Sequence, residues 1–114
     1  MSQHKIKKYL QDIIECIEQI KLFLGEKRDF NDFKDNLMLR KAVERNFEII
    51  GEAARNILNI SPDFKLSNAK QIIGLRNRIA HAYDSIDDSS LWVIIVNHLP
   101  VLEKEVKQLL IDVE

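Results

Sequence analysis

The stretch LRKAVERNFEIIGEAARNI, residues 39–57, decides the fold, because one spacing of apolar residues runs through its whole length. Successive apolar positions lie four or three residues apart, which is the pattern of a helix that buries one face. Pro62 follows shortly afterwards and predicts that the helix ends before it. The predicted buried stripe consists of Leu39, Val43, Phe47, Ile50, Ala54 and Ile57.

The same spacing precedes this stretch and predicts a first helix over residues 6–24. Gly25 follows it and is a typical stop signal. The two helices are joined by a polar segment, EKRDFNDFKDN, in which we expect Phe30 and Phe33 to plug the end of the core. The predicted stripe of the first helix consists of Ile6, Leu10, Ile13, Ile17, Ile20 and Leu24.

Two more helices are predicted beyond Pro62. The third begins near Ser67, a plausible N-cap, and buries Ile72, Leu75, Ile79 and Ala82. The fourth runs from Leu91 to about Val113, and Pro100 should kink it or split it in two. Its predicted stripe consists of Val93, Val96, Leu99, Leu102, Val106 and Leu109. The expected fold is all-α, an up-and-down bundle of four main helices with the last kinked at Pro100, and residues 1–114 form a single domain.

Composition narrows the class of protein. The chain has 114 residues, 46% of them hydrophobic and 31% charged, which suits a folded helical domain. Its net charge of -1 gives no overall basic field for nucleic acid, so any such site must be local. The single cysteine, Cys16, is expected to be a buried structural thiol. No segment resembles a signal peptide or a membrane span, so we expect a cytoplasmic protein.

The predicted third helix carries an unusual set of polar side chains in the segment LRNRIAHAYD, residues 75–84. At about 100° per residue, Arg76 and Tyr83 flank the edge of the apolar stripe, while Asn77 and His81 point outward. Asn77 and His81 are one helical turn apart, so the amide is able to orient the imidazole. An imidazole moves protons near neutral pH, and a guanidinium binds phosphate. No cluster of carboxylates or histidines at ligand spacing accompanies them, so no metal and no other cofactor is expected.

Simpler interpretations of these residues stay open on spacing alone. Arg76 is as well explained by an ion pair with Glu48 or Glu52, and Tyr83 by a position at the edge of the core. A histidine beside an arginine on a helix is also common on ordinary surfaces.

Beyond spacing, the chain resembles the HEPN superfamily, in its HepT-like branch. Arg76, His81 and Tyr83 match the R-x4-H-x-Y signature of that branch, with Asn77 directly after the arginine as is usual there. The segment AVERNFEIIGEAARNI, residues 42–57, is similar to the part of these proteins that carries their Gly-Glu-Ala motif. Trp92 and the HLP of residues 98–100 also fit. One departure is Ala82, where glycine is common in the family.

The resemblance implies a metal-independent endoribonuclease toxin of a type II-like toxin–antitoxin system, with RNA as substrate. Arg76 and His81 would be catalytic, Asn77 supporting, and Tyr83 the acceptor of AMP from a minimal nucleotidyltransferase antitoxin. Two copies usually assemble around a shared cleft, so a homodimer is expected, with Phe30, Phe33 and Trp92 as candidates for covering that cleft. The alternative is a non-catalytic HEPN module that binds a nucleotide or a partner.

Overall fold

Helices make up every element in the ranges that the computed structural model describes, which are residues 2–66, 71–74 and 88–113. The elements are α1 (Ser2–Leu24), α2 (Phe30–Lys34), α3 (Leu37–Ile60), α5 (Asp88–Val93), the π-helix η1 (Ile94–His98) and α6 (Leu99–Asp112). Residues 71–74 are helical as well. The all-α class predicted from the sequence is therefore confirmed. Of these helices, none is long and apolar enough to cross a membrane.

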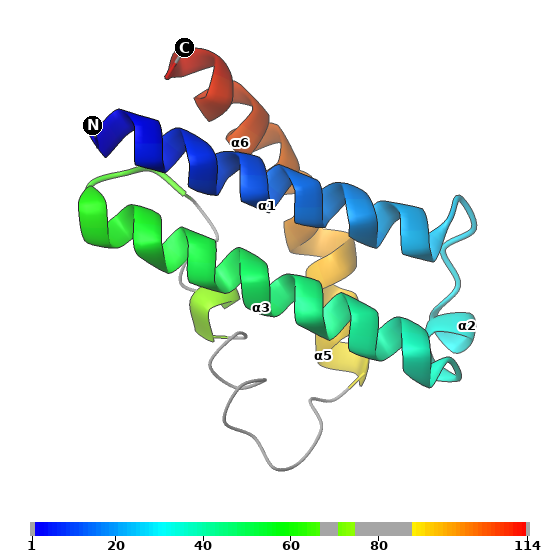
Figure 1. Ribbon diagram of the computed structural model, residues 1–114. Coiled ribbons are helices and arrows are strands. Elements are labelled where there is room, and N and C mark those ends of the chain that lie inside the picture. Colours follow the sequence, from blue (N-terminus) through cyan, green and yellow to red (C-terminus); the bar gives the residue numbers. More distant parts are fainter. Residues whose placement is uncertain (1, 67–70, 75–87, 114) are drawn as a thin grey trace.

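The two long helices α1 and α3 lie side by side and form the front layer of the molecule in Figure 1. In the same view α5, η1 and α6 follow one another in a line behind that layer, and α6 packs against α1. The start of α1 and the end of α6 lie on the same side of the molecule (Figure 1). The core between the layers is built from the predicted stripes of α1 and α3, since residues such as Leu10, Ile17, Phe47 and Ile50 are fully buried.

The ends of the first helices follow from local chemistry. Gly25 takes a φ of 72°, the left-handed conformation that glycine adopts freely, and its N–H donates to the Lys21 carbonyl at 3.0 Å. The side chain of Asn36 accepts from the Leu39 N–H at 3.0 Å and so caps the start of α3. That helix ends at Ile60, before Pro62, as predicted.

The joint between α1 and α3 contains a helix that the sequence pattern did not predict. In this short helix, α2, the Asp29 carboxylate caps the N-terminus by accepting from the N–H groups of Asn31 and Asp32. Phe33 is only 1% exposed, and its ring lies 5.3 Å from that of Trp92 between centroids. The prediction of an aromatic plug is confirmed. The companion idea that Phe33 covers a dimer cleft is wrong, because this ring is buried within its own chain.

The last helical stretch divides near Pro100, as predicted, but its buried face differs from the prediction. Val93 and Val96 were predicted to be buried and are 48% and 51% exposed. The cause is the spacing of the predicted stripe, because Val93, Val96 and Leu99 lie three residues apart, and at about 100° per residue each such step drifts about 60° around the helix. Pro100 lies in the first turn of α6, where its missing N–H does no harm. The stretch begins at Asp88, earlier than predicted, and the residues that it buries are Leu91, Ile95, Leu99, Leu102 and Val106.

Candidate functional site

The four predicted site residues, Arg76, Asn77, His81 and Tyr83, lie outside the described residues, as does the predicted N-cap Ser67. The structure therefore describes what flanks the motif on both sides. Before it, residues 71–74 are helical and Ile72 is fully buried in the core, as its predicted stripe required. After it, α5 begins at Asp88 and Leu91 is fully buried. The motif is thus bounded by two segments that are packed into the core.

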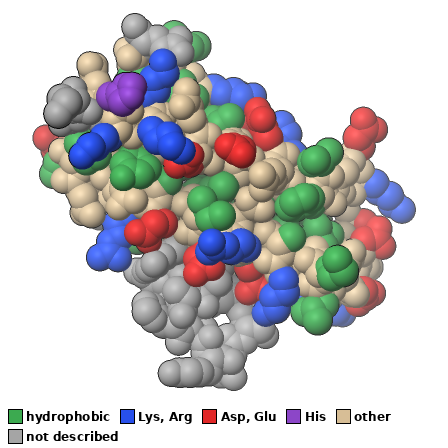
Figure 2. All heavy atoms as spheres, viewed as in Figure 1, with side chains coloured by type: hydrophobic (Ala, Val, Ile, Leu, Met, Phe, Trp, Pro, Cys, Tyr) green, Lys and Arg blue, Asp and Glu red, His purple; other side chains and the backbone are tan. Residues whose placement is uncertain are grey.

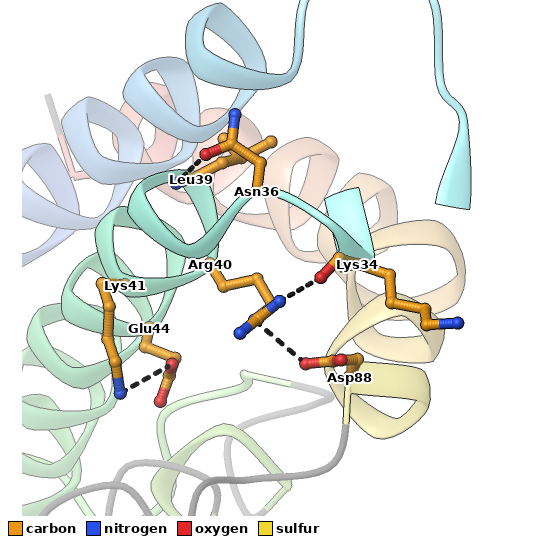
Figure 3. A network of polar contacts seen from close by, with 7 residues as sticks. All are labelled: Lys34, Asn36, Leu39, Arg40, Lys41, Glu44 and Asp88. Carbon is orange, nitrogen blue, oxygen red and sulfur yellow. Dashed lines mark hydrogen bonds and ion pairs between the residues drawn. The ribbon is translucent and has the colours of Figure 1, made fainter. Parts of the chain in front are cut away.

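A polar network holds the second of these flanks (Figure 3). The Arg40 guanidinium, from the first turns of α3, lies with Nε 3.2 Å from a carboxylate oxygen of Asp88. The same guanidinium donates a hydrogen bond to the backbone carbonyl of Lys34, at the end of α2. One side chain thereby connects three elements. Nothing in the sequence spacing pointed to Arg40, because its partner lies far away along the chain.

A groove runs between α1 and α3, with a volume of about 240 Å³. Among the described residues, the charged ones that line it are three acids, Asp12, Glu48 and Glu52, and one base, Arg45. Nη1 of Arg45 lies 3.5 Å from a carboxylate oxygen of Glu48. Three carboxylates and one guanidinium make a poor site for a phosphate backbone. The groove includes two residues of the Gly-Glu-Ala motif, Glu52 and Ala53, yet its charge does not suit RNA.

Cys16 lies beside a second hollow of about 210 Å³, next to the first. Burial raises the pKa of its thiol to about 11, with Asp12 and Glu15 adding to the effect. The thiolate is therefore scarce at neutral pH, and the thiol is a poor nucleophile. The prediction that Cys16 is a buried thiol is confirmed. The neighbouring Asn46 is also buried, and its side chain donates to the Ala42 carbonyl at 3.0 Å.

Exposed apolar side chains gather where α1 ends and α3 begins. They are Leu22, Phe23, Leu37 and Met38, and Met38 is 84% exposed. Figure 2 shows hydrophobic side chains at this end of the molecule, among charges of both signs. Among the described residues, no group of three or more His, Cys, Asp or Glu side chains gathers in a way that suits a metal ion.

Comparison with known proteins shows which family this sequence belongs to. The family described as Ribonuclease HepT-like matches residues 13–109, which is most of the chain. This chain belongs to the HepT-like family of the HEPN superfamily. The HepT-like chain is 41% identical over 111 residues to a protein of Methanocaldococcus jannaschii named "Putative RNase MJ1380", with 94% of this chain and 98% of that protein covered.

Two other relatives of this HepT-like protein are similar over most of their length. "Probable ribonuclease HepT" of Thermococcus cleftensis is 36% identical, with 90% of this chain and 94% of the relative covered. "Putative RNase TTE0752" of Caldanaerobacter subterraneus is 34% identical, with 90% of this chain and 91% of the relative covered. No solved structure matches the HepT-like chain.

Proposed function

We propose that the chain is an endoribonuclease that cleaves RNA without a metal ion, with Arg76 and His81 as catalytic residues and Asn77 supporting His81. The observation that carries this proposal is the family match over residues 13–109, a range that contains the whole motif. The ribonuclease names of the relatives support it. The direct test is cleavage of RNA by the purified chain in EDTA. The same test separates an enzyme from a module that only binds a nucleotide or a partner.

The proposed reaction needs one phosphate-binding group and one group that moves protons. The ribose 2′-oxygen attacks the adjacent phosphorus and closes a cyclic phosphate, while the bond from phosphorus to the 5′-oxygen of the next nucleotide breaks. The 2′-hydroxyl loses its proton, and the leaving 5′-oxygen gains one. The His81 imidazole, of a type with pKa near 6.5, suits this proton transfer. The Arg76 guanidinium suits the phosphate, whose negative charge it stabilises.

Within this proposal the protein is the toxin of a type II-like toxin–antitoxin system, and its antitoxin is a minimal nucleotidyltransferase. The Tyr83 oxygen attacks the α-phosphorus of ATP, the bond to the β-phosphate oxygen breaks, pyrophosphate leaves, and the phenol loses its proton. The attached phosphate adds negative charge near Arg76 in the motif. It would pair with the guanidinium that RNA needs and repel the RNA backbone.

The AMP acceptor is testable by removing one oxygen. Tyr83→Phe should keep RNA cleavage and escape inhibition by the cognate transferase with ATP, because only the acceptor hydroxyl is lost. Intact-mass spectrometry should show the mass of AMP on the wild-type chain and none on the variant. Tyr9→Phe, on α1, is the matched control and should still be modified. If the mass of AMP is still added to Tyr83→Phe, the modification lies on another residue, and the proposal that Tyr83 is the acceptor is wrong.

The proposed enzyme acts as a homodimer, which brings two motifs to one cleft. Leu37 and Met38 are exposed at the start of α3 and support a dimer interface there. Arg40, on the same turns of α3, contacts Asp88, which follows the motif in the chain, so an interface there would lie near the chain that carries the motif. Met38→Asp should shift the chain toward the monomer in light scattering at micromolar concentration. Ile111→Asp, on the 65% exposed Ile111 near the end of α6, should not. A wild-type chain that is monomeric under these conditions contradicts the dimer.

A further inference from the structure

The strongest unassigned feature of the described chain is the contact between Arg40 and Asp88. Its two charged groups are half-buried, at 23% and 31% exposure, so the pair is screened less than a fully exposed one. The Arg40 guanidinium also donates a hydrogen bond to the backbone carbonyl of Lys34. Lys34 is the last residue of α2, where carbonyl groups lack partners within the helix. A planar guanidinium serves both acceptors at once, which an ammonium group does less well.

The position of Asp88 in the chain gives this contact its significance. Asp88 opens α5 and follows Tyr83 after only four residues, DSID. A fully extended residue spans at most about 3.6 Å, so a chain of five residue steps, the separation of Tyr83 and Asp88 in the sequence, reaches no farther than about 18 Å. Where Asp88 is held therefore limits where the motif is able to lie. Arg40 sets that point relative to α2 and α3.

We propose that Arg40 is a positioning residue for the Arg76–His81 site, acting through Asp88. By holding the start of α5 against α2 and α3, it fixes the point at which the motif-bearing chain rejoins the core. The inference rests on the proposed ribonuclease function. It differs from a plain stabilising role, because a misplaced catalytic group lowers the rate of the chemical step even when the protein remains folded.

The kinetic test uses the full chain and an RNA substrate in EDTA. Arg40→Met and Asp88→Asn should each lower kcat about tenfold, with KM within twofold of the wild type. The double variant should be no worse than Arg40→Met alone, because that single variant already removes the contact with Asp88. Arg40→Lys keeps the charge but serves two acceptors less well, so it should recover only part of the lost kcat. Circular dichroism at the assay temperature supplies the folded fraction by which each kcat is corrected.

A matched control removes a different ion pair between elements. The Nζ of Lys21 on α1 lies 3.0 Å from a carboxylate oxygen of Glu103 on α6, and both residues lie far from residues 75–84 in the sequence. Lys21→Met should leave kcat and KM unchanged. If Arg40→Met matches the wild type in kcat after correction, or if Lys21→Met loses as much, Arg40 has no positioning role.

Hydrogen exchange separates failure of this inference from failure of the ribonuclease proposal. In Arg40→Met, the amides of α5 should exchange several-fold faster, while those in the middle of α1 keep their rates. If the wild-type chain cleaves no RNA, the proposed function is wrong, and the α5 exchange still decides whether Arg40 holds this segment. Unchanged α5 exchange in Arg40→Met would overturn the inference in either case.

Discussion

His81→Ala should reduce RNA cleavage by about 10²- to 10⁴-fold, the usual contribution of a general acid or base. Arg76→Ala should be similarly inactive, because it removes the guanidinium that is proposed to bind the phosphate. Both variants should keep the helical circular dichroism spectrum of the wild type. The reason is that His81 is predicted to point away from the apolar stripe of its helix.

The matched control for His81 is His4→Ala, which removes an exposed imidazole on α1. It should cleave RNA at the wild-type rate. The measurement is single-turnover cleavage of a labelled RNA, with the folded fraction of each variant checked alongside. A His81→Ala protein that cleaves at the wild-type rate contradicts the catalytic assignment.

The second large effect concerns stability. Phe47 is fully buried in the middle of α3, among the largest side chains of the core. Phe47→Ala should lower the free energy of unfolding by about 3–5 kcal/mol, since it removes apolar contacts and leaves a cavity. A chain of this size has only about 5–15 kcal/mol in total, so much of its stability would be lost.

Urea unfolding followed by circular dichroism measures this effect. Ile111→Ala is the control, because Ile111 is largely exposed and its truncation should change the free energy of unfolding by less than about 0.5 kcal/mol. Equal unfolding midpoints for the two variants would contradict the assignment of Phe47 to the core.

The sequence predicted the long helices well because one spacing persists over many turns. Residues such as Ile13 and Ile50 are buried as their stripes required, and Gly25 ends α1. The errors arise where the spacing is irregular or the element is short. Val93 and Val96 were predicted wrongly because the predicted stripe took steps of three residues there, whereas the buried residues Leu91, Ile95 and Leu99 lie four apart. The short helix α2 was missed because five residues are too few to show a period.

The site was predicted in a different way. Arg76, His81 and Tyr83 were selected by resemblance to a family motif, and their roles stay predictions because they lie outside the described residues. Arg40 and Asp88 show what spacing does not reveal, because their contact joins α3 to α5 and depends on the packing of the whole chain. The charge of the α1–α3 groove is a further such case, since it follows from which residues of two helices face each other.

We propose above all that this chain cleaves RNA without a metal ion. The most direct measurement is incubation of the purified wild-type chain with labelled RNA in excess EDTA, and analysis of the ends of the products. We expect cleavage at the same rate in EDTA and in Mg²⁺, with a cyclic phosphate on one product and a 5′-hydroxyl on the other. Absence of cleavage, or cleavage that EDTA abolishes, would contradict it.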